Sequence, residues 1–208
     1  MNGAAPVAQD LQPPPAYAGM RIGLLGGSFN PPHAAHRLIS LAALKRLRLD
    51  QVWWMVTPGN PLKAHNELAP LAARIRLSRE VSRHPRIKVT AFEAGIGTAY
   101  TAAALRFLSR RYPGVRFVWL MGADNLASFH RWNEWQAISS LMPIAVEDRP
   151  NWRHRALASP AARCYGRFRV PENGAAALAS LPPPAWCYLS GPLSKLSSTA
   201  LRSKRLRS

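Results

Sequence analysis

The chain has 208 residues, 48% of them hydrophobic, which is enough to bury the core of one large domain or two small ones. Lys and Arg outnumber Asp and Glu by 28 to 10, and the net charge of +18 favours negatively charged partners such as phosphorylated molecules or nucleic acid. The sequence contains no run apolar enough to span a bilayer, no secretion signal and no CxxC pair. We therefore expect a cytoplasmic protein without a membrane segment or a zinc site.

The predicted elements alternate between strand and helix along the chain. Residues 1–19 are rich in Ala and Pro and predict a flexible N-terminal arm, and residues 20–208 predict a single domain. Short apolar runs predict strands at 22–25, 52–56, 87–90, 115–121, 144–146 and 186–189. Helical spacing predicts helices over 34–49, 71–83, 101–112 and 124–141, the last broken near His130, and one more from Ser197 onward. Residues 151–184 give no clear pattern.

This alternation predicts an α/β fold, with a doubly wound, mostly parallel sheet and helices on both faces, like a Rossmann fold. In such sheets ligands bind beyond the carboxyl ends of the strands, where the strand order reverses. Polar residues at those ends are therefore the first candidates for a functional site.

The turn after the first strand, GGSFNPPHAAH from Gly26 to His36, is the most unusual stretch. We expect Gly26 and Gly27 to adopt unusual dihedrals and to let the backbone approach a ligand. The turn matches neither GxGxxG nor GxxxxGK[ST], which excludes the common dinucleotide and P-loop patterns. His33 and His36 are three residues apart and fall on one helix face, where two imidazoles favour phosphate binding over a metal site or a helix cap.

Two other segments offer groups that suit anions or sugars. Ser197, Ser198 and Thr199 resemble a helix N-terminus, which combines hydroxyls with free N–H groups, and Arg202 follows one turn later. Asp124 follows a predicted buried strand, where a carboxylate can accept from a ribose hydroxyl or cap the next helix.

Four segments in order resemble motifs of the bacterial nicotinate-nucleotide adenylyltransferases, members of the HxGH-type nucleotidyltransferase superfamily. They are GGSFNPPHAAH, the loop TPGNPLK, the segment GADNL with HRW, and the closing LSSTALR. Such enzymes transfer the adenylyl group of ATP to nicotinate mononucleotide, forming the dinucleotide and pyrophosphate in NAD biosynthesis. The acceptor phosphate is already a good nucleophile, so positioning and charge stabilisation suffice for catalysis.

The resemblance implies three groups of site residues. The catalytic group comprises His33, His36 and Arg202. The ATP-binding group comprises Gly26, Gly27, Ser28, Phe29, Asn30, Gly122, Asp124, Ser197, Ser198 and Thr199. The group for nicotinate mononucleotide comprises Asn60, Lys63, Tyr100, Thr101, Arg149 and Trp132, which would stack on the pyridine ring.

The resemblance also implies Mg²⁺ carried by ATP, with no protein metal cage. The sequence departs from the family pattern at three positions: Asn30 replaces a frequent Asp, Ala35 a usual Gly, and Leu62 a frequent His. Two alternatives stay open. The first is an enzyme of the same fold that acts on nicotinamide mononucleotide or on another phosphorylated acceptor. The second is a basic nucleic-acid-binding protein. We expect no specific nucleic acid partner, and the sequence leaves a homo-oligomer open.

Overall fold

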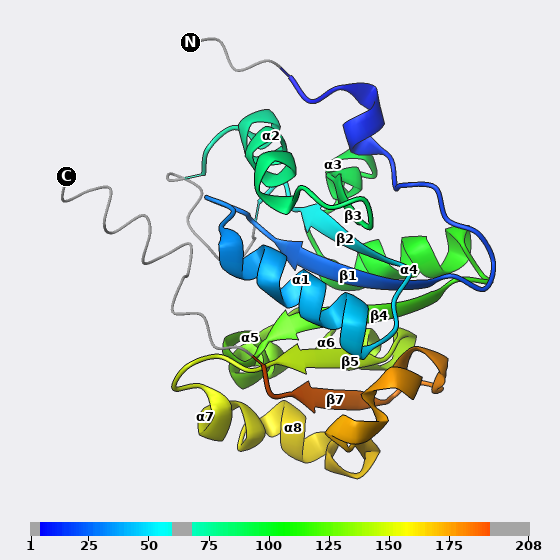
Figure 1. The fold of residues 1–208 in the computed structure, drawn as a ribbon, viewed down its shortest axis with the longest axis vertical. Helices are drawn as coiled ribbons and strands as arrows, with labels where there is room; N and C mark the ends of the chain where they lie inside the picture. Colours follow the sequence, from blue (N-terminus) through cyan, green and yellow to red (C-terminus); the bar gives the residue numbers. More distant parts are fainter. Residues whose placement is uncertain (1–4, 60–67, 192–208) are drawn as a thin grey trace, which may run out of the picture.

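A seven-stranded parallel sheet forms the centre of the fold in the computed structural model, which describes residues 5–59 and 68–191 (Figure 1). The strand order is β3-β2-β1-β4-β5-β7-β6, so the chain winds outward from β1 and then returns to add β4 on the other side. The strands are β1 (Arg21–Gly27), β2 (Gln51–Val56), β3 (Ile87–Thr90), β4 (Arg116–Gly122), β5 (Ile144–Glu147), β6 (Arg169–Val170) and β7 (Trp186–Leu189). The predicted α/β class is confirmed.

The connections between the strands are mostly helical. The α-helices are α1 (Ala34–Arg46), α2 (Leu71–Ser82), α3 (Phe92–Gly95), α4 (Thr101–Arg111), α5 (Ala123–Ser128), α6 (Trp135–Leu141), α7 (Arg153–Leu157) and α8 (Pro160–Cys164). The 3-10 helices are η1 (Ala8–Leu11), η3 (Phe129–Arg131), η4 (Gly166–Phe168) and η5 (Glu172–Ser180). The break near His130 is confirmed, since η3 separates α5 from α6, whereas α1 ends at Arg46 and not at the expected residue 49.

Each face of the sheet carries its own apolar core. Trp53 and Met55 of β2 point to the face covered by α4, α5 and α6, while Trp54 and Val56 point to the face covered by α1 and η5 (Figure 1). This alternation is what a parallel strand requires when both faces are covered, and it explains the continuous apolar runs in the sequence. Burial of these side chains is the main source of stability.

The N-terminal segment, expected as a flexible arm, packs along the edge of the sheet. The carbonyl of Asp10 accepts from the Ala91 N–H at 2.7 Å, and the Thr90 hydroxyl donates to the Gln12 carbonyl at 2.7 Å. The buried carboxylate of Asp10 pairs with Arg79 of α2. The described part of this segment therefore bonds to the chain directly after the edge strand β3 and to the side chain of its last residue, contacts between distant residues that the composition of the segment does not reveal.

Residues 151–184, which the sequence left unplaced, form short helices beside the β5–β7 edge (Figure 1). Helices α7 and α8 pack against α5, and β6 adds the outermost strand, pairing Arg169 with Trp186. In the part of the chain that the structure describes, no helix combines the length and apolarity needed to cross a membrane.

Candidate active site

The turn after β1 lies at the carboxyl edge of the sheet, where the strand order reverses between β1 and β4. The expectation of unusual dihedrals at Gly26 and Gly27 is wrong, because both lie in extended β1 and neither has a positive φ. Gly26 is required by space, since a Cβ there would lie 2.5 Å from the Trp119 ring. Gly26 therefore allows β1 to pack against β4, whereas a Cβ at Gly27 would meet only the Phe29 ring, at an ordinary 3.4 Å.

Phe29 anchors this turn in the core. Its backbone has a φ of 45°, which is unfavourable for a bulky residue and needs compensation from surrounding contacts. The ring is 1% exposed and stacks on Trp54, with ring centroids 4.9 Å apart. The side chain of Phe29 thus belongs to the core, so only its backbone remains available for the predicted ATP contact.

His33 and His36 lie together at the start of α1, as predicted. His33 is the N-cap residue and His36 lies in the first turn, with ring centroids 3.9 Å apart. The backbone N–H of His33 donates to Nδ1 of His36 at 3.2 Å. Because Nδ1 accepts this bond, the proton of a neutral His36 ring lies on Nε2 and is available to a ligand. The His36 ring is further held by Phe29 at 4.8 Å and Trp54 at 5.8 Å.

Both imidazoles are neutral near physiological pH. Burial first, and then the Arg149 cation, lower the pKa of His33 to about 4. Burial, followed by His33 and Arg149, lowers the pKa of His36 to about 3. Neutral imidazoles still donate one N–H each, so the pair can bind phosphate oxygens without being protonated.

Arg149 brings a fixed positive charge to the same site from the end of β5. Its Nε lies 3.1 Å from Oδ1 of Asp124, in the first turn of α5 after β4. Its backbone N–H donates to Oδ1 of Asp148 at 2.8 Å, and that oxygen also accepts from the Tyr188 hydroxyl at 2.6 Å. Elements following β1, β4 and β5 therefore place two imidazoles, a guanidinium and a carboxylate at one edge.

The other predicted site residues are more dispersed. Gly122 lies directly against this ion pair, because a Cβ there would meet Asp124 Oδ1 and would lie 2.8 Å from Arg149 Nε. Oδ1 of Asn30 accepts from the Ala69 N–H at 3.4 Å, which ties the turn to the segment before α2. Six predicted residues lie outside the described part of the chain: Asn60, Lys63, Ser197, Ser198, Thr199 and Arg202.

The residues predicted to contact the pyridine nucleotide lie along other helices of the same sheet. Tyr100 is exposed at the N-cap of α4, and Thr101 is the first residue of that helix. Trp132 is half-buried after η3 and contacts Trp119 and Phe129 edge-on, with centroids 6.4 and 5.5 Å apart. These ring contacts tie Trp132 to the core, and the role of the three residues in binding the nucleotide stays a prediction.

Sequence reasoning missed buried charged residues near this edge, among them Arg74 and Glu93. Arg74 of α2 is 2% exposed and donates to backbone carbonyls of the turns after β1 and β2. Glu93 is 4% exposed, and burial raises its pKa to about 7, partly offset by a hydrogen bond from Thr57. The one available signal was the helical spacing that puts Arg74 on the same face as Ile75 and Ser78.

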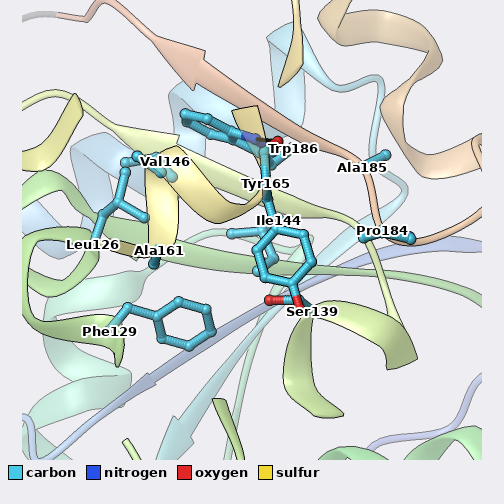
Figure 2. Close-up of a pocket in the computed structure, with 11 residues that line it drawn as sticks. Leu126, Phe129, Ser139, Ile144, Val146, Ala161, Tyr165, Pro184, Ala185 and Trp186 are labelled. Atoms are coloured by element: carbon cyan, nitrogen blue, oxygen red, sulfur yellow. Dashed lines mark hydrogen bonds between the residues drawn. The ribbon is translucent and has the colours of Figure 1, made fainter. Parts of the chain in front are cut away.

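An apolar pocket elsewhere in the fold is not the substrate site. Figure 2 shows it between Phe129, Tyr165 and Trp186, and residues of α6 and α8 also line it. Its volume of about 20 Å³ holds one water molecule and no nucleotide. Among the described residues no cluster of three His, Cys, Asp or Glu residues can hold a metal, and both cysteines are unpaired.

Imidazole and guanidinium donors at the switch point of a doubly wound parallel sheet define a nucleotide-binding α/β protein. The family model of cytidylyltransferase-like proteins matches residues 24–204. A probable nicotinate-nucleotide adenylyltransferase of Methylorubrum extorquens is 57% identical, over 89% of this chain and 100% of the relative. A second probable nicotinate-nucleotide adenylyltransferase, from Bradyrhizobium sp., is 59% identical over 88% of this chain and 96% of the relative.

Solved structures agree in fold. A nicotinic acid mononucleotide adenylyltransferase of Plasmodium falciparum, complexed with NaAD, superposes with a TM-score of 0.65. It is 15% identical, and the match covers 88% of this chain and 83% of that one. The chain belongs to the nicotinate-nucleotide adenylyltransferases of the cytidylyltransferase-like family.

The histidine pair makes the stability of the fold pH-dependent. Because the folded pKa values lie below the ordinary 6.5, each of these histidines binds more protons in the unfolded chain between about pH 4 and 6.5. The histidines lower the free energy of unfolding as pH drops through this range, by about 1 to 2 kcal/mol per histidine at about pH 5. Glu93 and Glu147, whose pKa values burial raises to about 7, act in the opposite direction, so the histidine contribution is read from the difference between the wild type and a variant without the pair. Urea unfolding at about pH 7.5 and about pH 5 measures this, and the double variant His33→Asn, His36→Asn should lose less stability on acidification than the wild type. An equal loss in both proteins would assign the effect to other groups.

Proposed function

We propose that this protein transfers the adenylyl group of ATP to nicotinate mononucleotide, yielding nicotinate adenine dinucleotide and pyrophosphate in the NAD biosynthesis of the cytoplasm. The observation that carries the proposal is the pair of adjacent, neutral imidazoles beside Arg149 at the strand-order switch. The phosphate of the mononucleotide attacks the α-phosphorus of ATP, the bond to the bridging oxygen breaks, and pyrophosphate leaves. No proton has to be removed from the nucleophile, so the reaction needs no general base.

In this proposal each group at the edge of the sheet has a distinct task. His33 and His36 donate to oxygens of the triphosphate, and Arg149 offsets the negative charge where the two substrates meet. Asp124 orients Arg149 through their ion pair and accepts from a ribose hydroxyl. Ser197, Ser198, Thr199 and Arg202 bind the β- and γ-phosphates, while Tyr100, Thr101, Trp132, Asn60 and Lys63 bind nicotinate mononucleotide, as the motif resemblance implies.

Mg²⁺ enters this proposal with ATP. The described residues offer no metal cage, which fits an ion held by phosphate oxygens and water. When bound, the ion neutralises charge on the phosphates. The protein's own contribution is to hold the two substrates in line and to exclude other geometries.

The decisive test is pyrophosphate release from ATP and Mg²⁺ with nicotinate mononucleotide and, in a parallel reaction, nicotinamide mononucleotide. We expect turnover with the acid to exceed turnover with the amide by at least about tenfold, because one charge on the ring distinguishes them. Equal turnover would assign the enzyme a broader acceptor range. No turnover with either would refute the proposed reaction and direct the search to other phosphorylated acceptors.

A further inference from the structure

Arg74 is a buried cation without an acidic partner among the described residues. It lies on the inward face of α2 beside Ile75, and the residue is 2% exposed to solvent. The described salt bridges do not include it. Burying a guanidinium is costly unless its N–H groups are bonded, so the compensation must come from neutral acceptors.

Those acceptors are four backbone carbonyls from three separate segments. Nη1 donates to Ser28 in the turn after β1 and to Thr57 in the turn after β2, both at 2.8 Å. Nη2 donates to Pro58 at 3.3 Å, and Nε donates to Ala69, directly before α2, at 2.8 Å. The planar, branched guanidinium is the one side chain that can reach all of these acceptors at fixed angles.

Two of the three segments that Arg74 joins are those that the proposed reaction must align. Ser28 belongs to the turn that carries His33 and His36. Thr57 and Pro58 begin the loop that the motif resemblance assigns to nicotinate mononucleotide. Two further hydrogen bonds connect the same segments. The Thr57 N–H donates to the Gly27 carbonyl at 3.1 Å, and the Ala69 N–H donates to Oδ1 of Asn30 at 3.4 Å.

We propose that Arg74 is a positioning residue that fixes the ATP turn against the acceptor loop, so that the two phosphates meet in line. The inference rests on the proposed function for the identity of the substrates. Arg74 acts through backbone carbonyls and touches no substrate. Its loss therefore relaxes the relative placement of the loops, which lowers kcat more than it weakens the binding of either substrate alone.

The test compares Arg74→Lys and Arg74→Gln with two matched controls on α2. Arg76→Gln removes an exposed guanidinium that pairs only with Glu80 among the described residues. Ile75→Val removes a buried methyl group without touching the loops, so it measures plain destabilisation. We expect kcat to fall about 100-fold in Arg74→Gln, somewhat less in Arg74→Lys, and less than twofold in both controls. KM for each substrate should change by less than about tenfold.

A second readout uses the protein without substrates. Hydrogen exchange of the Thr57 and Ala69 amides should accelerate by about tenfold or more in both Arg74 variants, while amides of β4 keep their rates. The proposal is wrong if Arg74→Lys keeps the wild-type kcat and exchange rates. It is also wrong if Ile75→Val, at the same melting temperature as Arg74→Lys, shows the same fall in kcat and the same rise in exchange rates. Wild-type inactivity with nicotinate mononucleotide would instead refute the proposed reaction, and hydrogen exchange would still decide whether Arg74 joins the loops.

Discussion

Replacement of His36 by alanine is expected to lower kcat for pyrophosphate release by about 100- to 1000-fold, because it removes an oriented donor from the reacting phosphates. The orientation is built in: His36 Nδ1 accepts the His33 backbone N–H at 3.2 Å, so Nε2 must carry the proton. Since burial, followed by His33 and Arg149, holds its pKa at about 3, the ring stays neutral and the loss should not depend on pH between about 6 and 9.

The control for this variant is His84→Ala. His84 also accepts a backbone N–H on Nδ1, from Arg86 at 3.2 Å, but it precedes β3 at the opposite edge of the sheet. The His84→Ala variant should keep kcat within about twofold of the wild type. His36→Gln should recover part of the loss, because its amide can place a donor near the position of Nε2. Wild-type kcat in His36→Ala would remove His36 from the mechanism, whatever the melting temperature.

The elements that sequence patterns predicted well are those whose signal is local. The strand β7 lies where its apolar run put it, because a parallel strand buried on both faces needs a continuous apolar sequence. The edge strand β3 also has its expected bounds, although its burial is interrupted at Lys88. The turn between β1 and α1 was recognisable because Gly, Pro and His are rare together. Helix α1 ended earlier than expected, since its periodic pattern continues through Leu47 and Leu49, which are buried after the helix has ended.

What escaped prediction depends on contacts between distant parts of the chain. Asp10 pairs with Arg79, and no local pattern tells that a Pro-rich segment will cover a sheet edge. The need for glycine at position 26 comes from the ring of Trp119 on the neighbouring strand. Arg74 was missed because an arginine in a helix is ordinarily exposed, and its four acceptors are carbonyls, which any sequence supplies.

Removal of the Arg149 charge by Arg149→Met is expected to lower kcat/KM for nicotinate mononucleotide by about 100-fold or more. The side chain lies close enough to lower the pKa of both histidines, and its Nε is 3.1 Å from Asp124. The same change leaves the Asp124 carboxylate without its cation among negatively charged substrates, which adds to the loss. Steady-state kinetics at saturating ATP and Mg²⁺ measure the effect.

Arg153→Met is the matched control, because Arg153 forms an ion pair with Asp148 at 3.6 Å and is half-exposed beside Tyr188. It should change kcat/KM by less than about threefold.

Arg149→Met also has a consequence that needs no substrate: without the cation, the pKa values of His33 and His36 rise toward 6.5. The unfolded and folded chains then differ less in bound protons between about pH 4 and 6.5, so Arg149→Met should lose less stability on acidification than the wild type. An unchanged pH dependence together with unchanged kcat/KM would show that Arg149 does not act on the histidine pair at all.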